Sequence, residues 1–183
     1  MFEGCPNCLR AGFPSSVAPQ YTRLPRSLDR NGAAGLGRYA DWLPYHKFIT
    51  LGEGNTPLLC AEELGQSVGV GEFFIKQEGA NPTGSHKDRM SCQVAARALD
   101  IGAQSVIAAS SGNAGVSLAA YSAAAGLACE IVATATCNVL FRRAMEMYGA
   151  RVVATRHLPD RWRYMEARVK KAGAYPVTNY LTP

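Results

Sequence analysis

One lysine in this sequence stands in a setting that favours chemistry. Residues 81–89 read NPTGSHKDR, with a proline and a glycine two residues apart, so we expect a polar turn here. Ser85 can cap a helix that runs on through Leu99, which places Lys87 in the first turn of that helix. A helix N-terminus and burial both favour a neutral amine, and a neutral amine can form a Schiff base with a carbonyl. Taken alone, the stretch is also compatible with a solvated surface lysine.

A second loop carries polar groups at the end of a predicted strand. Residues 110–115 read SSGNAG; they follow an apolar strand at residues 105–109 and open an alanine-rich helix. In an open parallel sheet, ligands bind beyond the carboxyl ends of the strands, and helix N-termini bind anions there. Gly112 lets the backbone approach a ligand and Asn113 adds an amide, although the loop could also be an ordinary turn.

The elements that carry both loops follow a regular rhythm. Glycines at positions 102, 126, 149 and 173 lie 24, 23 and 24 residues apart, each between a helical pattern and an apolar strand. A glycine in the left-handed conformation ends each helix, and the strands are expected at residues 105–109, 130–133, 151–154 and 175–178. The alternation predicts an α/β fold with a parallel sheet and helices on both faces. Because no helix follows the last strand, the chain looks like a portion of a longer polypeptide.

The N-terminal part differs from this unit. We expect residues 1–50, which are rich in proline and glycine, to form an irregular extension with one short helix at residues 36–43. We expect residues 51–183, which carry both candidate loops, to be the N-terminal part of a catalytic domain, with a strand at residues 72–76 ahead of the lysine loop.

The six cysteines are too few and too unevenly spaced for a disulfide framework. Cys5 and Cys8 have the spacing of half a zinc site, but no second pair follows nearby, so a metal-free remnant is favoured. The remaining four are expected to be small buried hydrophobic residues: Cys60, Cys92, Cys129 and Cys137.

Charge and hydropathy narrow the class of protein. The net charge is +5, and nine of the nineteen basic residues lie between Arg142 and Lys171, without a nucleic-acid-binding motif. A solvated face, or attraction of phosphorylated or carboxylate substrates, is favoured over a nucleic-acid partner. The uncharged segment 101–129 is broken by the SSGN loop, so it predicts two buried elements and no membrane span. The start shows no signal peptide, so we expect a cytoplasmic protein.

Three stretches in this order resemble the motifs of the fold-type II pyridoxal-phosphate-dependent enzymes. They are GEGNTPL at residues 52–58, NPTGSHKDR at residues 81–89 and SSGN at residues 110–113. The resemblance is closest to threonine synthase and its relatives. It implies a tryptophan synthase β-like fold, pyridoxal 5'-phosphate as cofactor, a small amino-acid substrate and a possible homodimer.

The resemblance also implies residue roles. Lys87 would be the Schiff-base lysine that carries protons at the substrate carbons, and Asn113 would hydrogen-bond the cofactor's 3-hydroxyl. Asp88 and Arg89 would brace the loop. The residues implied to hold the substrate are Thr56, Ser110, Ser111 and Gly112. The implied reaction converts O-phosphohomoserine and water into threonine and phosphate.

The resemblance is incomplete in two respects. His86 stands where threonine synthases usually carry phenylalanine, and it is expected to pack there, although titration near neutral pH is the alternative. The family's loop for the cofactor phosphate belongs to its later half and is not found in these 183 residues. Three other functions therefore stay open: a serine/threonine dehydratase, a cysteate-synthase-like enzyme, and a non-catalytic domain unable to hold the cofactor.

Overall fold

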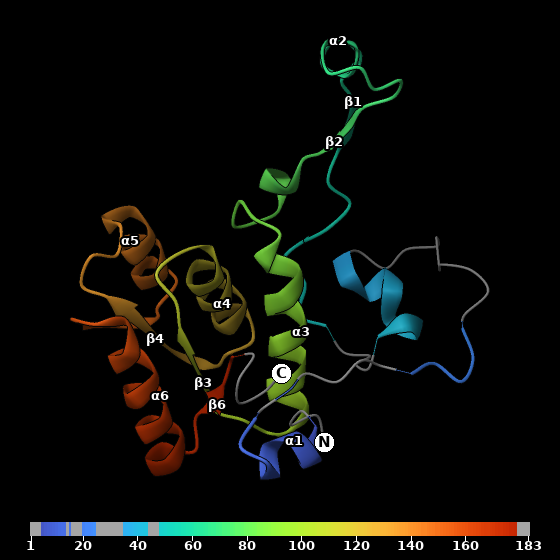
Figure 1. Ribbon diagram of the computed structural model, residues 1–183. Coiled ribbons are helices and arrows are strands. Elements are labelled where there is room, and N and C mark those ends of the chain that lie inside the picture. The colour runs from blue at the N-terminus through green and yellow to red at the C-terminus, as the bar shows by residue number, and fades with distance from the viewer. Residues whose placement is uncertain (1–4, 14, 16–19, 25–34, 44–47, 179–183) are drawn as a thin grey trace.

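The protein is an α/β structure with a small separate hairpin (Figure 1). A computed structural model describes residues 5–13, 15, 20–24, 35–43 and 48–178. The N-terminal elements are α1 (Pro6–Arg10), the 3-10 helix η1 (Gly35–Trp42), β1 (Leu58–Cys60), α2 (Glu62–Ser67), β2 (Phe74–Lys76) and the 3-10 turn η2 (Glu78–Ala80). The remaining elements are α3 (Lys87–Asp100), β3 (Ser105–Ala109), α4 (Asn113–Ala124), β4 (Ala128–Thr134), α5 (Val139–Met147), β5 (Arg151–Thr155), α6 (Leu158–Ala172) and β6 (Tyr175–Pro176).

Four of the strands form one parallel sheet in the order β5-β4-β3-β6. Val106 lies opposite Cys129, and Ile131 lies opposite Val152, so the apolar centres of the strands are in register. The prediction of a parallel sheet is confirmed, and each expected strand is present. The last strand is shorter than expected, because β6 ends at Pro176.

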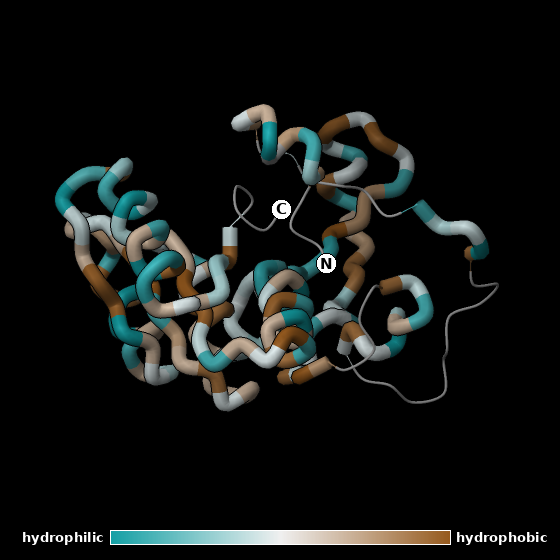
Figure 2. Tube along the Cα trace, turned by 90° about the horizontal axis from the view of Figure 1, so that it is seen from below, coloured by the Kyte–Doolittle hydropathy of each residue, from teal (hydrophilic) through white to brown (hydrophobic). Residues whose placement is uncertain are grey.

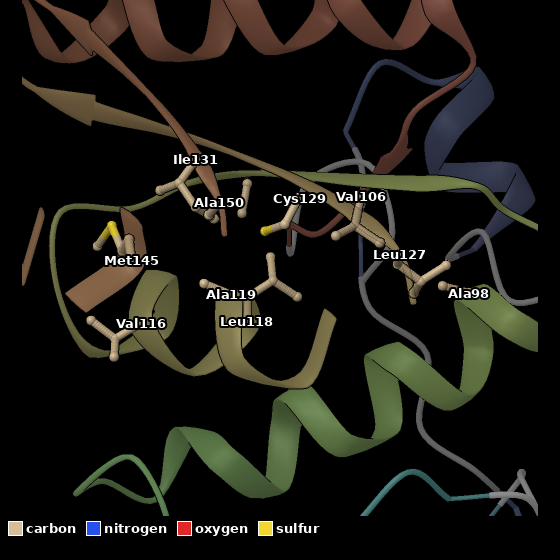
Figure 3. Close-up of a cluster of buried hydrophobic side chains, with 11 residues drawn as sticks. Ala98, Val106, Val116, Leu118, Ala119, Leu127, Cys129, Ile131, Met145 and Ala150 are labelled. Carbon is tan, nitrogen blue, oxygen red and sulfur yellow. The ribbon is translucent and has the colours of Figure 1, made fainter. Parts of the chain in front are cut away.

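Helices cover both faces of this sheet, as predicted. On one face, the side chains of β3 and β4 pack against Leu118 of α4 and Met145 of α5 (Figure 3). On the opposite face, Ile107 and Val132 pack against Met165 of α6. Successive strand residues point to opposite faces, which is why strands covered on both sides are apolar throughout.

The helices end where the sequence rhythm places them. Gly102, Gly126, Gly149 and Gly173 all have positive φ values, between 63° and 85°. At Gly173 this left-handed residue is the C-cap of α6, and its N–H is bonded to the carbonyl of Val169. A side chain with a Cβ is strained at this φ, so the predicted role of these glycines is confirmed.

The hairpin of β1 and β2 projects from the rest of the protein together with α2 (Figure 1). Its two strands pair antiparallel, and all six of their residues are exposed. Hydrophobic segments therefore also lie outside the body formed by the sheet and its helices (Figure 2). Cys60 is exposed here, so the expectation that it is buried is wrong, and Cys137 is only half-buried; Cys92 and Cys129 are buried as predicted.

Part of the N-terminal extension packs on the core. The expected short helix is present as η1, and its Leu36 is buried among Cys92, Ala95 and Tyr121. Most of the prolines used to predict irregular structure lie outside the described residues. Within the described part of the chain, no helix is long and apolar enough to span a membrane.

The basic segment is partly neutralised by carboxylates. Glu130 of β4 accepts hydrogen bonds from Arg151 at 3.0 Å and from Arg168 at 3.1 Å. Arg142 pairs with Glu146 one helical turn away on α5. These pairs are consistent with a solvated, mixed-charge surface on α5 and α6.

Candidate active site

Lys87 is the first residue of α3, as the sequence predicted. The turn before it closes through a hydrogen bond from Gly84 N–H to the Asn81 carbonyl, at 2.8 Å. Ser85 Oγ accepts the N–H of Lys87 at 3.3 Å, so this hydroxyl serves the start of the helix. The Lys87 side chain is half-buried, and its amine has no hydrogen bond or ion pair among the described residues. That amine is free to react with a ligand.

The buried carboxylate of Asp88 holds the turn that precedes α3. Asp88 is fully buried, and its two oxygens accept hydrogen bonds from the N–H and the hydroxyl of Thr83. The hydrogen bonds between Thr83 and Asp88 therefore close a loop of residues 83–88, and Lys87 is one of the residues of this loop. Because both carboxylate oxygens of Asp88 are bonded to Thr83, Asp88 braces the loop, in agreement with the sequence prediction.

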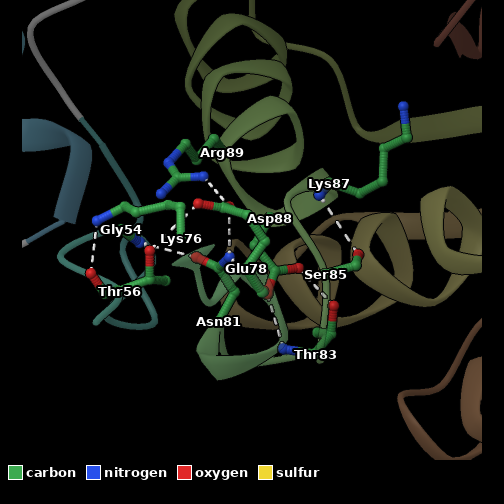
Figure 4. A network of polar contacts seen from close by, with 10 residues as sticks. All are labelled: Gly54, Thr56, Lys76, Glu78, Asn81, Thr83, Ser85, Lys87, Asp88 and Arg89. Atoms are coloured by element: carbon green, nitrogen blue, oxygen red, sulfur yellow. Dashed lines mark hydrogen bonds and ion pairs between the residues drawn. The ribbon is translucent and has the colours of Figure 1, made fainter. Parts of the chain in front are cut away.

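A second carboxylate, that of Glu78 in η2, joins three segments (Figure 4). It forms an ion pair with Arg89 and accepts hydrogen bonds from Asn81 Nδ2 at 2.9 Å and Thr56 Oγ1 at 3.2 Å. Asn81 in turn accepts the N–H of Gly54 at 2.9 Å. The hydrogen bond from Arg89 is the main reason that the pKa of Glu78 falls to about 2. The lysine loop, the 54–56 loop and α3 are thus tied together by one ionised group.

The SSGN loop is built by its own hydroxyls. Ser110 Oγ accepts the N–H groups of Gly115 at 2.9 Å and Gly112 at 3.4 Å, which caps the start of α4. Ser111 Oγ lies 3.1 Å from Thr134 Oγ1 and accepts the Thr134 N–H at 3.0 Å, which ties the loop to the end of β4. Both hydroxyls are therefore engaged in shaping the loop.

The same arrangement leaves a set of donors open. Among the described residues, the backbone N–H groups of Ser111, Asn113 and Ala114 have no acceptor. Gly112 has no atom within 4 Å of the position that a Cβ would take, so a ligand can approach the backbone there. Unbonded N–H groups at a helix N-terminus fit a carboxylate. The Asn113 side chain is exposed and can turn its amide to a ligand.

A buried hydroxyl pair joins the helices that these two loops begin. Ser117 donates a hydrogen bond to Ser91 at 2.8 Å, and both residues are fully buried between α3 and α4. Ser91 lies four residues after Lys87, and Ser117 lies four residues after Asn113. One turn further on, Ala95 and Tyr121 belong to the same buried cluster, which fits two helices that run in the same direction. The N-termini of α3 and α4 therefore lie at the same end of the helix pair, which is the end that carries Lys87 and the SSGN loop.

Two other predicted residues occupy less direct positions. Thr56 is 5% exposed, and its hydroxyl donates to Glu78, on the side of the polar network away from the Lys87 amine (Figure 4). His86 is exposed at the N-cap position of α3. The structure therefore places Lys87 and the SSGN loop at the same end of two paired helices, with Thr56 on the far side of the Glu78 network; the roles of all these residues, and of His86, remain predictions.

Residues missed in the sequence support this site. Glu78, Ser91 and Ser117 carry no motif signal of their own, because each acts through a partner that is distant in sequence. Glu53 lies within the GEGN stretch but was not singled out, although it is fully buried and bonded to Tyr121 Oη at 2.7 Å. Only the tertiary structure brings these partners together.

Cys8 lies in α1, and Cys5 directly precedes that helix, which lies away from the start of α3 (Figure 1). Hydrogen bonds from the backbone and the thiol of Cys8 lower the pKa of Cys5. Among the described residues there is no group of three or more metal-ligating side chains, and the zinc site at Cys5 and Cys8, the less favoured alternative, stays untested.

The chain is similar in sequence to enzymes of one family. The family model described as pyridoxal-phosphate dependent enzyme matches residues 49–183. A threonine synthase from Halalkalibacterium halodurans is 43% identical over 122 residues, which cover 64% of this chain and 34% of the relative. One from Methanocaldococcus jannaschii is 41% identical over 128 residues, which cover 68% of this chain and 32% of the relative. The chain thus spans about a third of the length of these curated relatives.

The solved structures agree with these matches. A pyridoxal 5'-phosphate-dependent aspartate racemase superposes with a TM-score of 0.62 at 30% identity, covering 68% of this chain and 40% of that one. The similarity therefore extends to the three-dimensional arrangement of the sheet and its helices.

Proposed function

The chain belongs to the pyridoxal-phosphate-dependent enzymes, and on this premise we propose that it takes part in threonine synthesis from O-phosphohomoserine and water, with release of phosphate. The similarity to two threonine synthases at about 40% identity supports this choice of substrate. The proposed enzyme is a lyase that acts on a small amino acid. Because the chain covers about a third of the length of these relatives, the proposal concerns the activity of a polypeptide of their full length, of which this chain would be one part.

One observation carries the proposal: the Ser91–Ser117 bond, one turn into each helix, puts the starts of α3 and α4, and with them Lys87 and the SSGN loop, at the same end of the helix pair. An unbonded amine fits an aldehyde, and a cradle of N–H groups fits the carboxylate of an amino acid. The residues present therefore fit the cofactor and its substrate. When bound, pyridoxal 5'-phosphate supplies an aldehyde for the amine and an electron sink for substrate carbanions.

The chain's own groups would divide the remaining work. The N–H groups of Ser111, Asn113 and Ala114 would hold the substrate carboxylate, in a loop shaped by the Ser110 and Ser111 hydroxyls. Lys87 Nζ would take protons from Cα and Cβ of the substrate and return a proton later, as a general base and acid. The Asn113 amide would donate to the cofactor's 3-hydroxyl.

Thr56 would have a restricted part in binding. Its hydroxyl proton is committed to the Glu78 carboxylate, which can only accept hydrogen bonds. The free lone pairs of Thr56 Oγ1 would therefore face a donor, such as the ammonium group of an amino acid.

The first test concerns the amine. The 183-residue chain is incubated with pyridoxal 5'-phosphate, and we expect an absorbance band at roughly 410–430 nm that borohydride removes, with the label retained on Lys87. Lys87→Ala should abolish both signals, whereas Lys171→Ala, which removes an exposed lysine of α6, should not. A folded chain with neither band nor label would instead be a non-catalytic domain.

The second test concerns the reaction. Phosphate release from O-phosphohomoserine is compared with ammonia release from serine or threonine, using a polypeptide that contains this chain and has the full length of its threonine synthase relatives. We expect phosphate release that Lys87→Ala eliminates. Ammonia release alone would instead identify a dehydratase that uses the same lysine.

A further inference from the structure

We propose that Glu78 is a positioning residue for Lys87, an inference that rests on the function proposed above. Glu78 lies outside the three sequence motifs and makes no contact with the Lys87 amine. It acts through Arg89, which follows Lys87 by two residues in the first turn of α3.

The argument starts from the freedom of the Lys87 side chain. Its amine has no partner among the described residues, so its direction depends on where the backbone of the first turn of α3 lies. The first turn of a helix is also its least constrained part, because its N–H groups lack intrahelical acceptors. Contacts that fix this turn therefore decide where the amine points.

Two carboxylates fix this turn through the two residues that follow Lys87. Asp88 binds Thr83 and closes the loop that precedes the helix. Glu78 holds Arg89, the residue after Asp88, and thereby ties the helix to η2. Figure 4 shows the Lys87 side chain extending away from this network. The backbone next to Lys87 is held through Asp88 and Arg89, while the Lys87 amine is left unbonded among the described residues.

Glu78 also connects this turn to the 54–56 loop. Its second oxygen accepts the hydroxyl of Thr56, and Asn81 carries the link on to the N–H of Gly54. A displacement of the 54–56 loop would therefore be transmitted to Arg89 and to the first turn of α3. Glu78 can perform this role throughout the neutral range, because a carboxylate paired with a guanidinium stays ionised there.

The test measures the selectivity of Lys87 as an amine. Each variant of the 183-residue chain is labelled with pyridoxal 5'-phosphate and reduced with borohydride, and the Lys87 label is divided by the Lys171 label in the same molecules. A misplacement of about 1 Å lowers rates on the order of a hundredfold, so Glu78→Gln should lower this ratio at least about fivefold. Glu146→Gln, which removes an exposed carboxylate paired with Arg142, should leave it unchanged.

A double-mutant cycle separates positioning from general loss of structure. If Glu78 acts through Arg89, Arg89→Gln should lower the ratio as Glu78→Gln does, and the two together should lower it no further. Independent effects of the two substitutions would overturn the inference. If Glu78→Gln does not fold, Glu78→Asp keeps the charge on a shorter side chain, and a folded Glu78→Asp with an unchanged ratio would also overturn it.

The outcomes distinguish this inference from the proposed function. A wild-type chain that labels Lys87 no faster than Lys171 would contradict the proposed role of Lys87 itself. A wild-type chain that labels Lys87 selectively, with the same selectivity in folded Glu78→Gln, would overturn only the role of Glu78.

Discussion

Two glutamates of this protein accept several hydrogen bonds each, but they serve different ends. Glu53 is fully buried between the N-terminal extension and α4, whereas the side chain of Glu78 is 30% exposed beside the lysine loop. Both pKa values lie below the ordinary glutamate value. The same chemical group therefore supports the fold in one place and the site in the other.

Glu53 joins segments that are far apart in sequence. Its oxygens accept the N–H of Leu36 at 3.0 Å, the N–H of Leu51 at 3.1 Å and the hydroxyl of Tyr121 at 2.7 Å. Burial raises the pKa of this carboxyl, and the hydrogen bonds, first that of Tyr121, outweigh burial and lower it. A buried charge is stable only when it is satisfied in this way.

Glu78 is held by a guanidinium near solvent. A pair of this kind adds little to the free energy of folding, because water competes for both groups. The comparison indicates that a buried carboxylate acts mainly on stability. A partly exposed carboxylate beside the lysine loop acts mainly on the geometry of the site. We expect Glu53 substitutions to lower the free energy of unfolding and Glu78 substitutions to misplace Lys87.

The largest effect is expected for Glu53→Gln. An amide in place of the carboxylate turns a donor toward groups that need an acceptor, so the free energy of unfolding should fall by about 3 kcal/mol at pH 7. Urea unfolding followed by circular dichroism measures this loss. Glu146→Gln is the matched control and should change stability by less than about 0.5 kcal/mol. Equal losses in both variants would refute the distinction between buried and exposed carboxylates.

Gly35→Ala should have the second largest effect. Gly35 has a φ of 61°, and a Cβ at this position would meet the side chains of Thr50 and Glu53. The strain and the displaced carboxylate should together cost about 2 kcal/mol of unfolding free energy. Gly12 also has a positive φ but has open space around its Cβ position, so Gly12→Ala isolates the cost of backbone strain. If both variants lose the same stability, contact with Glu53 contributes nothing.

Tyr121→Phe tests a single hydrogen bond to Glu53. Burial and the bond to Glu53 raise the pKa of Tyr121, so the phenol remains a donor at all working pH values. Its removal should cost about 1.5 kcal/mol, because the other donors to Glu53 remain. Thermal unfolding of Tyr121→Phe and of Tyr148→Phe, an exposed control, gives the difference. A loss as large as that of Glu53→Gln would mean that Tyr121 alone satisfies the carboxylate.

Glu78→Gln should have the smallest effect on stability, below about 1 kcal/mol at pH 7. Because the folded pKa of Glu78 is about 2 and its ordinary value is 4.5, its contribution is complete above pH 4.5. It should disappear as the pH falls from 4.5 to about 2, where wild type and Glu78→Gln become equally stable. Urea midpoints measured across this range follow the change. A difference that persisted at pH 2 would show that the ion pair is not its source.

Much of the fold follows from local sequence signals. The four glycines that end helices and the apolar strands after them predicted the βα units, because both depend on nearby residues. Lys87 and the SSGN loop were predicted for the same reason, since a turn and a helix start are local features. The exposure of Cys60 was missed, because it depends on what packs against the hairpin and not on the residue's own hydrophobicity.

The sequence by itself determined which groups are available: the Lys87 amine at the start of a helix and the SSGN loop after a strand. Tertiary structure decided how they meet. The Ser91–Ser117 bond joins residues 26 positions apart and brings the starts of α3 and α4 to the same end of the helix pair. The Glu53–Tyr121 bond joins residues 68 positions apart. Pairings at such separations depend on the packing of whole helices, which no window of neighbouring residues specifies.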